Sequence, residues 1–193
     1  DESEITCTGI FTRLDEGECI EVHGEYVEHA VYGMQFKVDE NVLSPRPESE
    51  LLVDAALKYI GQNNFKTVLD LCTGSGAIGV SLAKLGNDLK VTCSDLSKDA
   101  LATAKGNALA NGLKSIKFEQ GDLFAPFRGK LGRKKFDFII SNPPYIESEV
   151  IPTLQTEVKD HEPMIALDGG VDGLDFYRQI ALEAPNHLKK GGV

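Results

Sequence analysis

The chain has 193 residues, 41% hydrophobic and 26% charged, which is the balance of a globular protein that can build a core. No apolar run approaches the ~18 residues of a transmembrane helix, and the acidic, polar start of the chain argues against a signal peptide. The formal charge of −10 disfavours tight binding to a phosphate backbone, and the four cysteines have no metal-ligand spacing and suit a reducing cytoplasm.

Residues 1–46 are expected to form an N-terminal segment that ends in a β-hairpin and a linker. Apolar residues alternate through residues 26–32 and again through 34–38, with Gly33 between the two stretches. A period of two on both sides of a glycine predicts two antiparallel strands. Pro45 and Pro47 then interrupt regular structure, so the main domain is expected to begin at residue 47.

Residues 47–193 are expected to form an α/β domain. Pro47 suits the first turn of a helix, and apolar residues recur at helical spacing up to Ile60, with Gly61 as the cap. Strands and helices then alternate, which predicts a parallel sheet with helices on both faces. The predicted strands are residues 67–71, 90–94, 116–119 and 136–141, and the predicted later helices are residues 76–85, 98–110, 153–160 and 175–190.

A glycine-rich loop follows the first of these strands and opens a helix. Gly74, Gly76 and Gly79 match the dinucleotide fingerprint GxGxxG, and Asp95 lies 95 − 76 = 19 residues beyond the second glycine. Glycine lets a ligand approach the backbone closely, and an acidic side chain at this spacing can accept both hydroxyls of a ribose. No Lys-Ser or Lys-Thr pair follows, so the loop is not a phosphate-binding P-loop.

Three of the predicted strands are followed by a carboxylate: Asp70, Asp95 and Asp122. The carboxyl ends of parallel strands meet at one edge of the sheet, where ligands of such folds bind. A carboxylate at Asp70 would repel a pyrophosphate but suits a cation, such as the amino group of S-adenosylmethionine. The alternative is that Asp70 only caps the following turn. We therefore expect a nucleoside cofactor bound across this edge.

The tetrapeptide Asn142-Pro143-Pro144-Tyr145 directly follows the predicted central strand. Its two prolines fix the backbone and remove two N–H donors. The Asn142 side-chain oxygen and the Pro143 carbonyl can then act as acceptors aimed at one point, where they would orient a planar NH₂ group. Tyr145 offers a flat face against an amide or a base. The alternative is an ordinary turn, which Asn-Pro often begins.

On these motifs the chain resembles the class I S-adenosylmethionine-dependent methyltransferases. More narrowly, it is similar to the PrmC or HemK family, which methylates the glutamine amide of class-1 peptide chain release factors. The resemblance runs from about Arg13 to the end of the chain. Many amino-group methyltransferases share the glycine loop and Asn-Pro-Pro-Tyr. The resemblance to the PrmC or HemK family in particular comes from Ser-Pro-Arg-Pro-Glu at 44–48 and Asp-Gly-Gly at 168–170.

The resemblance implies a doubly wound, Rossmann-like α/β fold, a cytoplasmic location and a release factor as partner, with no membrane involved. S-adenosylmethionine would be converted to S-adenosylhomocysteine while the tetrapeptide holds the glutamine of a Gly-Gly-Gln loop. The catalytic residues would be Asn142, Pro143 and Tyr145. The cofactor-binding residues would be Asp70, Cys72, Thr73, Gly74, Ser75, Gly76, Asp95, Leu96, Asp122, Leu123 and Asn142, and the substrate-binding residues would be Asn142, Pro143, Pro144 and Tyr145.

The chain departs from the family in two ways. Cys72 stands where the family usually has glycine, and a positive φ there would cost roughly 1 kcal/mol or more. The chain also looks truncated at both ends, because most of the family's N-terminal helical domain is absent and the pair Gly191-Gly192 usually leads into another strand. We therefore expect an uncovered sheet edge near residues 136–141 and weak catalysis.

Two other functions remain open. An amino-methyltransferase acting on adenine or cytosine in DNA or RNA would recognise the same NH₂ geometry. The basic run at residues 128–135 favours a local anion contact or is a solvated loop, while the acidic balance argues against nucleic acid. A nicotinamide-nucleotide-binding oxidoreductase would use the GxGxxG match but would leave Asn-Pro-Pro-Tyr without a role.

Overall fold

The computed structural model describes residues 22–23, 26–129, 132–159 and 162–193. Within these residues the main sheet has four parallel strands in the order β6-β5-β4-β9. The strands are β4 (Thr67–Leu71), β5 (Lys90–Asp95), β6 (Lys117–Gln120) and β9 (Phe138–Ser141). Residues 68–71 of β4 are buried, as expected for the centre of a sheet covered on both faces. The predicted parallel sheet is confirmed.

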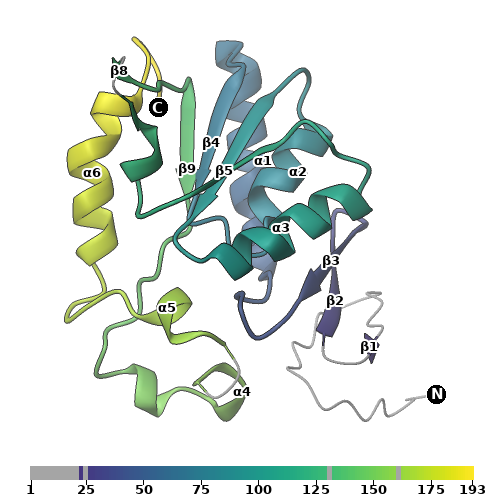
Figure 1. Cartoon of the computed structure of the whole chain (residues 1–193), viewed down its shortest axis with the longest axis vertical. Helices are drawn as coiled ribbons and strands as arrows, with labels where there is room; N and C mark the ends of the chain where they lie inside the picture. The colour runs from purple at the N-terminus through teal and green to yellow at the C-terminus, as the bar shows by residue number, and fades with distance from the viewer. Residues whose placement is uncertain (1–21, 24–25, 130–131, 160–161) are drawn as a thin grey trace.

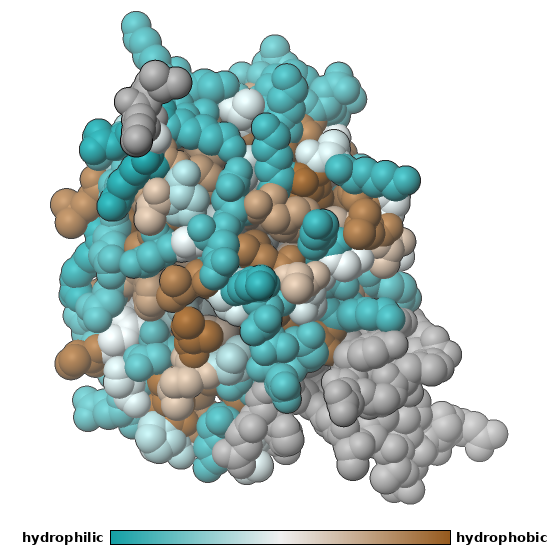
Figure 2. All heavy atoms as spheres, in the orientation of Figure 1, coloured by the Kyte–Doolittle hydropathy of each residue, from teal (hydrophilic) through white to brown (hydrophobic). Residues whose placement is uncertain are grey.

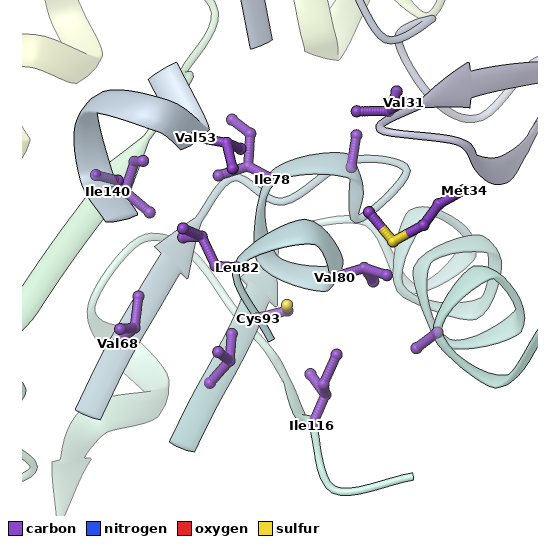
Figure 3. Packing of buried hydrophobic residues seen from close by; sticks show 14 of the residues in the cluster. Val31, Met34, Val53, Val68, Ile78, Val80, Leu82, Cys93, Ile116 and Ile140 are labelled. Carbon is purple, nitrogen blue, oxygen red and sulfur yellow. The ribbon is translucent and has the colours of Figure 1, made fainter. Parts of the chain in front are cut away.

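Helices cover both faces of this sheet (Figure 1). On one face lie α1 (Pro47–Asn63), α2 (Ala77–Leu85) and α3 (Lys98–Ala110), and on the other lies α6 (Asp175–His187). Successive side chains of a strand point to opposite faces. Val68 accordingly joins the larger core with Val53 and Ile78 (Figure 3), whereas Leu69 and Leu71 join the core against α6. The predicted doubly wound arrangement is confirmed.

A three-stranded antiparallel sheet precedes α1. It consists of β1 (Val22–His23), β2 (Tyr26–Val31) and β3 (Met34–Val38). Tyr32 and Gly33 join β2 to β3 with φ of 51° and 70°, the backbone that a two-residue hairpin turn requires. Buried and exposed residues alternate along β3. The predicted hairpin is confirmed.

The buried side chain of Asn107 on α3 ties this hairpin to the glycine-rich loop. Its oxygen accepts from the backbone N–H of Lys37 at 2.8 Å, and its nitrogen donates to the carbonyl of Lys37 at 2.9 Å and to that of Ser75 at 2.8 Å. These three bonds use both N–H donors and one acceptor site of the buried amide. The hairpin is thereby held against the loop that the sequence marks as the binding site.

Several predicted helices have different bounds in the structure. α2 begins one residue later than predicted, and α6 ends at His187 rather than at residue 190. α1 continues past Gly61, and Asn64 ends it in the left-handed conformation, with its N–H bonded to the carbonyls of Ile60 and Gly61. Asn tolerates this conformation, so glycine was not needed as the cap and the predicted end was wrong. The predicted helix at 153–160 is replaced by η2 (Ile151–Thr153) and α4 (Thr156–Lys159). The predicted segment up to residue 21 lies outside the described residues.

Short elements complete the fold. They are η1 (Ala125–Phe127), β7 (Arg128–Gly129), β8 (Gly132–Arg133) and α5 (Met164–Leu167). Val193 pairs with β9, because its N–H donates to Asp137 at 3.0 Å and its carbonyl accepts from Ile139 at 2.8 Å. Over the described ranges, no helix is both long and apolar enough to cross a membrane.

Candidate functional site

The glycine-rich loop turns the chain from β4 into α2. Gly74 and Gly76 adopt φ of 54° and 84°, where residues with a side chain are strained. A Cβ on Gly76 would also lie 3.0 Å from the Cβ of Ala104, so α3 can approach the loop only because this residue is glycine. The loop is therefore closely packed from behind.

The carboxylate of Asp70 lies beneath this loop and is fully buried. Its Oδ2 accepts from the hydroxyl of Thr73 at 2.5 Å and from the backbone N–H of Gly79 at 2.9 Å, and its Oδ1 has no partner among the described residues. Burial raises the pKa of Asp70 to about 7, although both hydrogen bonds favour the charged form. The carboxylate thus joins the end of β4 to the first turn of α2.

The carboxylate of Asp95 lies at the end of β5 and faces the loop from the other side. Its Oδ2 accepts from the N–H of Gly74 and its Oδ1 from the N–H of Ser97, both at 2.9 Å. Burial raises the pKa of Asp95, while these N–H groups lower it. Each carboxylate oxygen has a further lone pair, so Asp95 keeps the capacity to accept from two hydroxyls.

A cavity at the carboxyl edge of the sheet brings ten of the expected site residues together. The ten are Cys72, Thr73, Gly74, Ser75, Asp95, Leu96, Asp122, Leu123, Asn142 and Pro144. The other expected residues, Asp70, Gly76, Pro143 and Tyr145, do not line it. The hydrogen bonds of Asp70 are those of the alternative interpretation, a cap of the turn, and its contact with a cofactor stays a prediction.

One wall of this cavity was not expected from the sequence. Residues 41–45, which connect β3 to α1, line it together with Ile165, Ala166 and Phe176. The segment is held there because Val42 packs with Val38 and Ala100. The prolines of this segment predicted an interruption of regular structure. The position of the segment against α3 could not be predicted, because it depends on contacts between distant residues. Figure 2 shows hydrophobic residues, in brown, near the middle of the visible face with hydrophilic residues around them.

The Asn-Pro-Pro-Tyr segment leaves the end of β9 beside the cavity. The side chain of Asn142 makes no hydrogen bond with another described residue, so its amide is available to a ligand. Pro143 and Pro144 are buried, whereas Tyr145 is 55% exposed. Gly169 and Gly173 lie against the backbone of Tyr145 so closely that a Cβ on either would come within 2.6 Å of it. The Asp-Gly-Gly turn thus supports the tetrapeptide.

A second cavity adjoins the first and is lined by Tyr145. The two cavities share Leu43, Ser49, Asn142 and Ala166. Arg46, just before α1, and Glu162, just before α5, form an ion pair in the second cavity, with 2.9 Å between Nη2 and Oε1. Asn142 therefore stands at the junction of two spaces, as a group that contacts two ligands must.

The basic run at residues 128–135 is largely occupied by contacts within the protein. Arg128 pairs with Glu183, and the ammonium of Lys135 donates to the carbonyl of Leu188 at 3.1 Å. The ammonium of Lys134 donates to Thr92 at 3.3 Å and lies over the ring of Phe136. Lys130 lies outside the described residues. Neither cavity is lined by this run.

Comparison with known families finds two matches. The profile of the methyltransferase small domain matches residues 41–160. The profile of the OB-fold domain of the ATP-dependent DNA helicase YrrC matches residues 1–44, of which the structure describes only residues 22–23 and 26–44.

Curated relatives carry the name release factor glutamine methyltransferase. That of Clostridium acetobutylicum is 51% identical over 164 residues, covering 83% of this chain and 56% of the relative. That of Bacillus cereus is 44% identical over 166 residues, covering 84% of this chain and 57% of the relative. The chain thus spans a little more than half the length of the curated relatives it matches.

Solved structures share the fold. An S-adenosylmethionine-dependent methyltransferase from Agrobacterium tumefaciens has a TM-score of 0.61 at 19% identity, covering 90% of this chain and 52% of that one. A methyltransferase from Pyrococcus furiosus has a TM-score of 0.54 at 21% identity, covering 84% of this chain and 68% of that one.

The buried Asp70 predicts how stability depends on pH. Its pKa is about 7 in the folded chain and about 3.9 in an unfolded one, so folding favours the protonated form. The stability that comes with this proton is fully present below about pH 4 and is lost as the pH rises through about 7. The free energy of unfolding of the wild type, relative to Asp70→Asn, should therefore fall over this window.

Denaturant titrations at a series of pH values measure this difference. Asp99→Asn, at an exposed site on α3, is the control and should give a curve parallel to that of the wild type. A constant difference between the wild type and Asp70→Asn would show that the Asp70 carboxyl titrates as it does in water.

The backbone at Cys72 is strained, since its φ is 60° and only glycine adopts such a value freely. Relief of this strain is worth about 1–2 kcal/mol, against roughly 0.5–1 kcal/mol for the greater chain entropy of glycine. Cys72→Gly should therefore be more stable than Cys72→Ala, by up to about 1.5 kcal/mol, in chemical unfolding. At the exposed helical residue Ala102, glycine should instead lose about 1 kcal/mol. An alanine variant at least as stable as the glycine variant would rule out strain at residue 72.

Proposed function

Because the chain belongs to the methyltransferase small domain family, we propose that it methylates, from S-adenosylmethionine, the side-chain amide nitrogen of the glutamine in the Gly-Gly-Gln loop of a peptide chain release factor. The observation that carries this proposal is the place of Asn142 at the junction of two cavities. The curated relatives, at up to 51% identity, supply the substrate class. A release factor substrate also implies action in the cytoplasm.

The chemistry of the residues that line the first cavity fits S-adenosylmethionine. The Asp95 carboxylate retains lone pairs for the hydroxyls of the ribose. Leu96, Leu123 and Phe176 supply apolar walls against which a base can pack. Asp122 is exposed in the same cavity and adds a negative charge that suits a cationic cofactor. When bound, the cofactor supplies an activated methyl group on a sulfonium.

The second cavity receives the acceptor amide. An amide nitrogen is a poor nucleophile because its lone pair is delocalised, so the protein contributes chiefly by positioning it. The Asn142 oxygen and the Pro143 carbonyl would accept both hydrogens of the NH₂ group and thereby direct its nitrogen toward the first cavity. Such positioning can supply ~7–11 kcal/mol of rate acceleration. Acceptors at these two points also stabilise positive charge that develops on the nitrogen.

Tyr145 lies in the second cavity, where its ring can cover the planar face of the amide. Its support by Gly169 and Gly173 limits the backbone positions that it can take. We assign it to substrate positioning, with Pro143 and Pro144 as the rigid part of the same segment. The described residues of the cavities include no histidine or lysine, and no base is needed before transfer, because the methylated amide nitrogen is strongly acidic and releases one proton to solvent water afterwards.

Asp95→Ala should weaken the binding of S-adenosylmethionine. Hydrogen bonds to a charged acceptor are worth about 1.5–3 kcal/mol, which corresponds to a dissociation constant roughly 10-fold to 150-fold higher. Titration calorimetry measures the change, and Asp99→Ala, whose exposed carboxylate lies outside both cavities, is the matched control. Unchanged affinity in a folded Asp95→Ala variant would remove Asp95 from the cofactor site.

Asn142→Ala tests the proposed function itself. The rate constant for methyl transfer to a release factor should fall by at least about 100-fold, while the affinity for S-adenosylmethionine changes much less, because Asn142 orients the acceptor. Single-turnover kinetics separate the two effects, with Asn186→Ala at the exposed end of α6 as the control. A rate constant within about threefold of the wild-type value would contradict the assigned role.

A further inference from the structure

The ion pair between Arg46 and Glu162 has no part in the transfer step described above. It lies in the second cavity, which also contains Asn142 and Tyr145. The side chain of Glu162 is 0% exposed, whereas that of Arg46 is 29% exposed. A buried ion pair seldom adds stability over an apolar pair of similar size. A role in substrate binding would explain why the pair lies beside Asn142 and Tyr145.

One oxygen of this pair is left without a partner. Oε1 of Glu162 accepts from Arg46 at 2.9 Å, but Oε2 makes no hydrogen bond within the described residues. Burial raises the pKa of Glu162, while the guanidinium of Arg46 favours the charged form. A buried acceptor without a donor is rare in folded proteins and points to a missing partner. Glu162 thus keeps one unpaired, buried acceptor in the wall of the cavity.

Arg46 offers the complementary group. Its guanidinium carries five N–H donors, and Nη2 uses one of them on Glu162. The remaining donors are partly accessible, because the side chain is partly exposed and lines the same cavity. The cavity therefore presents an acceptor and donors side by side, which matches the N–H and the C=O of a peptide.

The charge of the cavity favours a peptide over a nucleic acid. Among the described residues, its acidic and basic lining residues are Arg46, Glu48 and Glu162, whose charges add to −1 when all three are ionised. A phosphate would meet this negative charge and the open carboxylate oxygen, which is unfavourable. The other walls include Leu52, Ile146 and Leu167. A neutral, extended peptide segment fits both the charge and the apolar walls.

We propose that Arg46 and Glu162 bind the main-chain N–H and C=O of one extended residue of the acceptor loop, next to the glutamine held by Asn142. Glu162 accepts from the N–H of that residue, and Arg46 donates to its C=O. The inference rests on the proposed function and adds to it a way of telling a glutamine within a peptide from other amides. Both residues are positioning residues, because they act on the substrate away from the reacting nitrogen.

The first test changes the substrate and leaves the protein intact. A set of peptides that contain Gly-Gly-Gln is prepared, each with one main-chain nitrogen near the glutamine methylated so that it cannot donate. For the wild type, KM should rise by about tenfold or more at one position, with kcat unchanged for that peptide. The effect should be confined to that position, because only one N–H meets Glu162.

The second test changes the protein. In Glu162→Gln the amide oxygen can still accept from Arg46, so the NH₂ group is left at the open position and meets the peptide N–H as a second donor. KM for the unmodified peptide should rise by about tenfold, while kcat and the affinity for S-adenosylmethionine remain within about twofold. N-methylation at the sensitive position should then no longer raise KM. Glu149→Gln, exposed and outside both cavities, should behave as the wild type.

The outcomes separate this inference from the proposed function. Transfer to the peptides with equal KM for every N-methylated form would overturn the peptide subsite and leave the proposed function intact. Absence of transfer to any glutamine peptide or release factor would overturn both. Should Glu162→Gln fail to fold, the peptide series on the wild type still decides the question.

Discussion

The buried carboxylate of Asp70 is the constraint on which the site depends. A polar group in the core is tolerated only where hydrogen bonds compensate it, and Asp70 obtains them from Thr73 and from the N–H of Gly79. These bonds tie the end of β4, the glycine loop and the first turn of α2 into one unit. With the loop held in this form, the N–H of Gly74 meets Asp95 and the carbonyl of Ser75 meets Asn107.

The local pattern of the sequence was sufficient to predict the parallel sheet and the edge of the sheet at which the cavity lies. Period-two stretches, glycines and strand ends are local features, and they placed Asp95, Asn142 and the loop at residues 72–75 together. The face to which Asp70 points was not predicted, although it follows from alternation with Leu69 and Leu71 in β4. The wall at residues 41–45 and the pair of Arg46 with Glu162 could not be predicted, because they depend on contacts between distant segments.

The two cavities divide the proposed reaction into binding of the cofactor and positioning of the acceptor, and Asn142 belongs to both. This division explains why rigid groups surround Asn142: two buried prolines follow it, and the Asp-Gly-Gly turn lies against the backbone of Tyr145. A reaction that depends on alignment gains from such rigidity, because the reacting atoms must be held at near-attack distance. The strained Cys72 in the loop is compatible with this view, since strained backbone often occurs at functional sites.

The most direct test of this account locates the transferred methyl group. The purified protein is incubated with a release factor and S-adenosylmethionine that carries an isotopic label in its methyl group, and the product is analysed by fragmentation mass spectrometry. The account predicts one labelled methyl group on the side-chain nitrogen of the glutamine in the Gly-Gly-Gln loop. Label on another residue, or no label from a protein that binds S-adenosylmethionine, would contradict it.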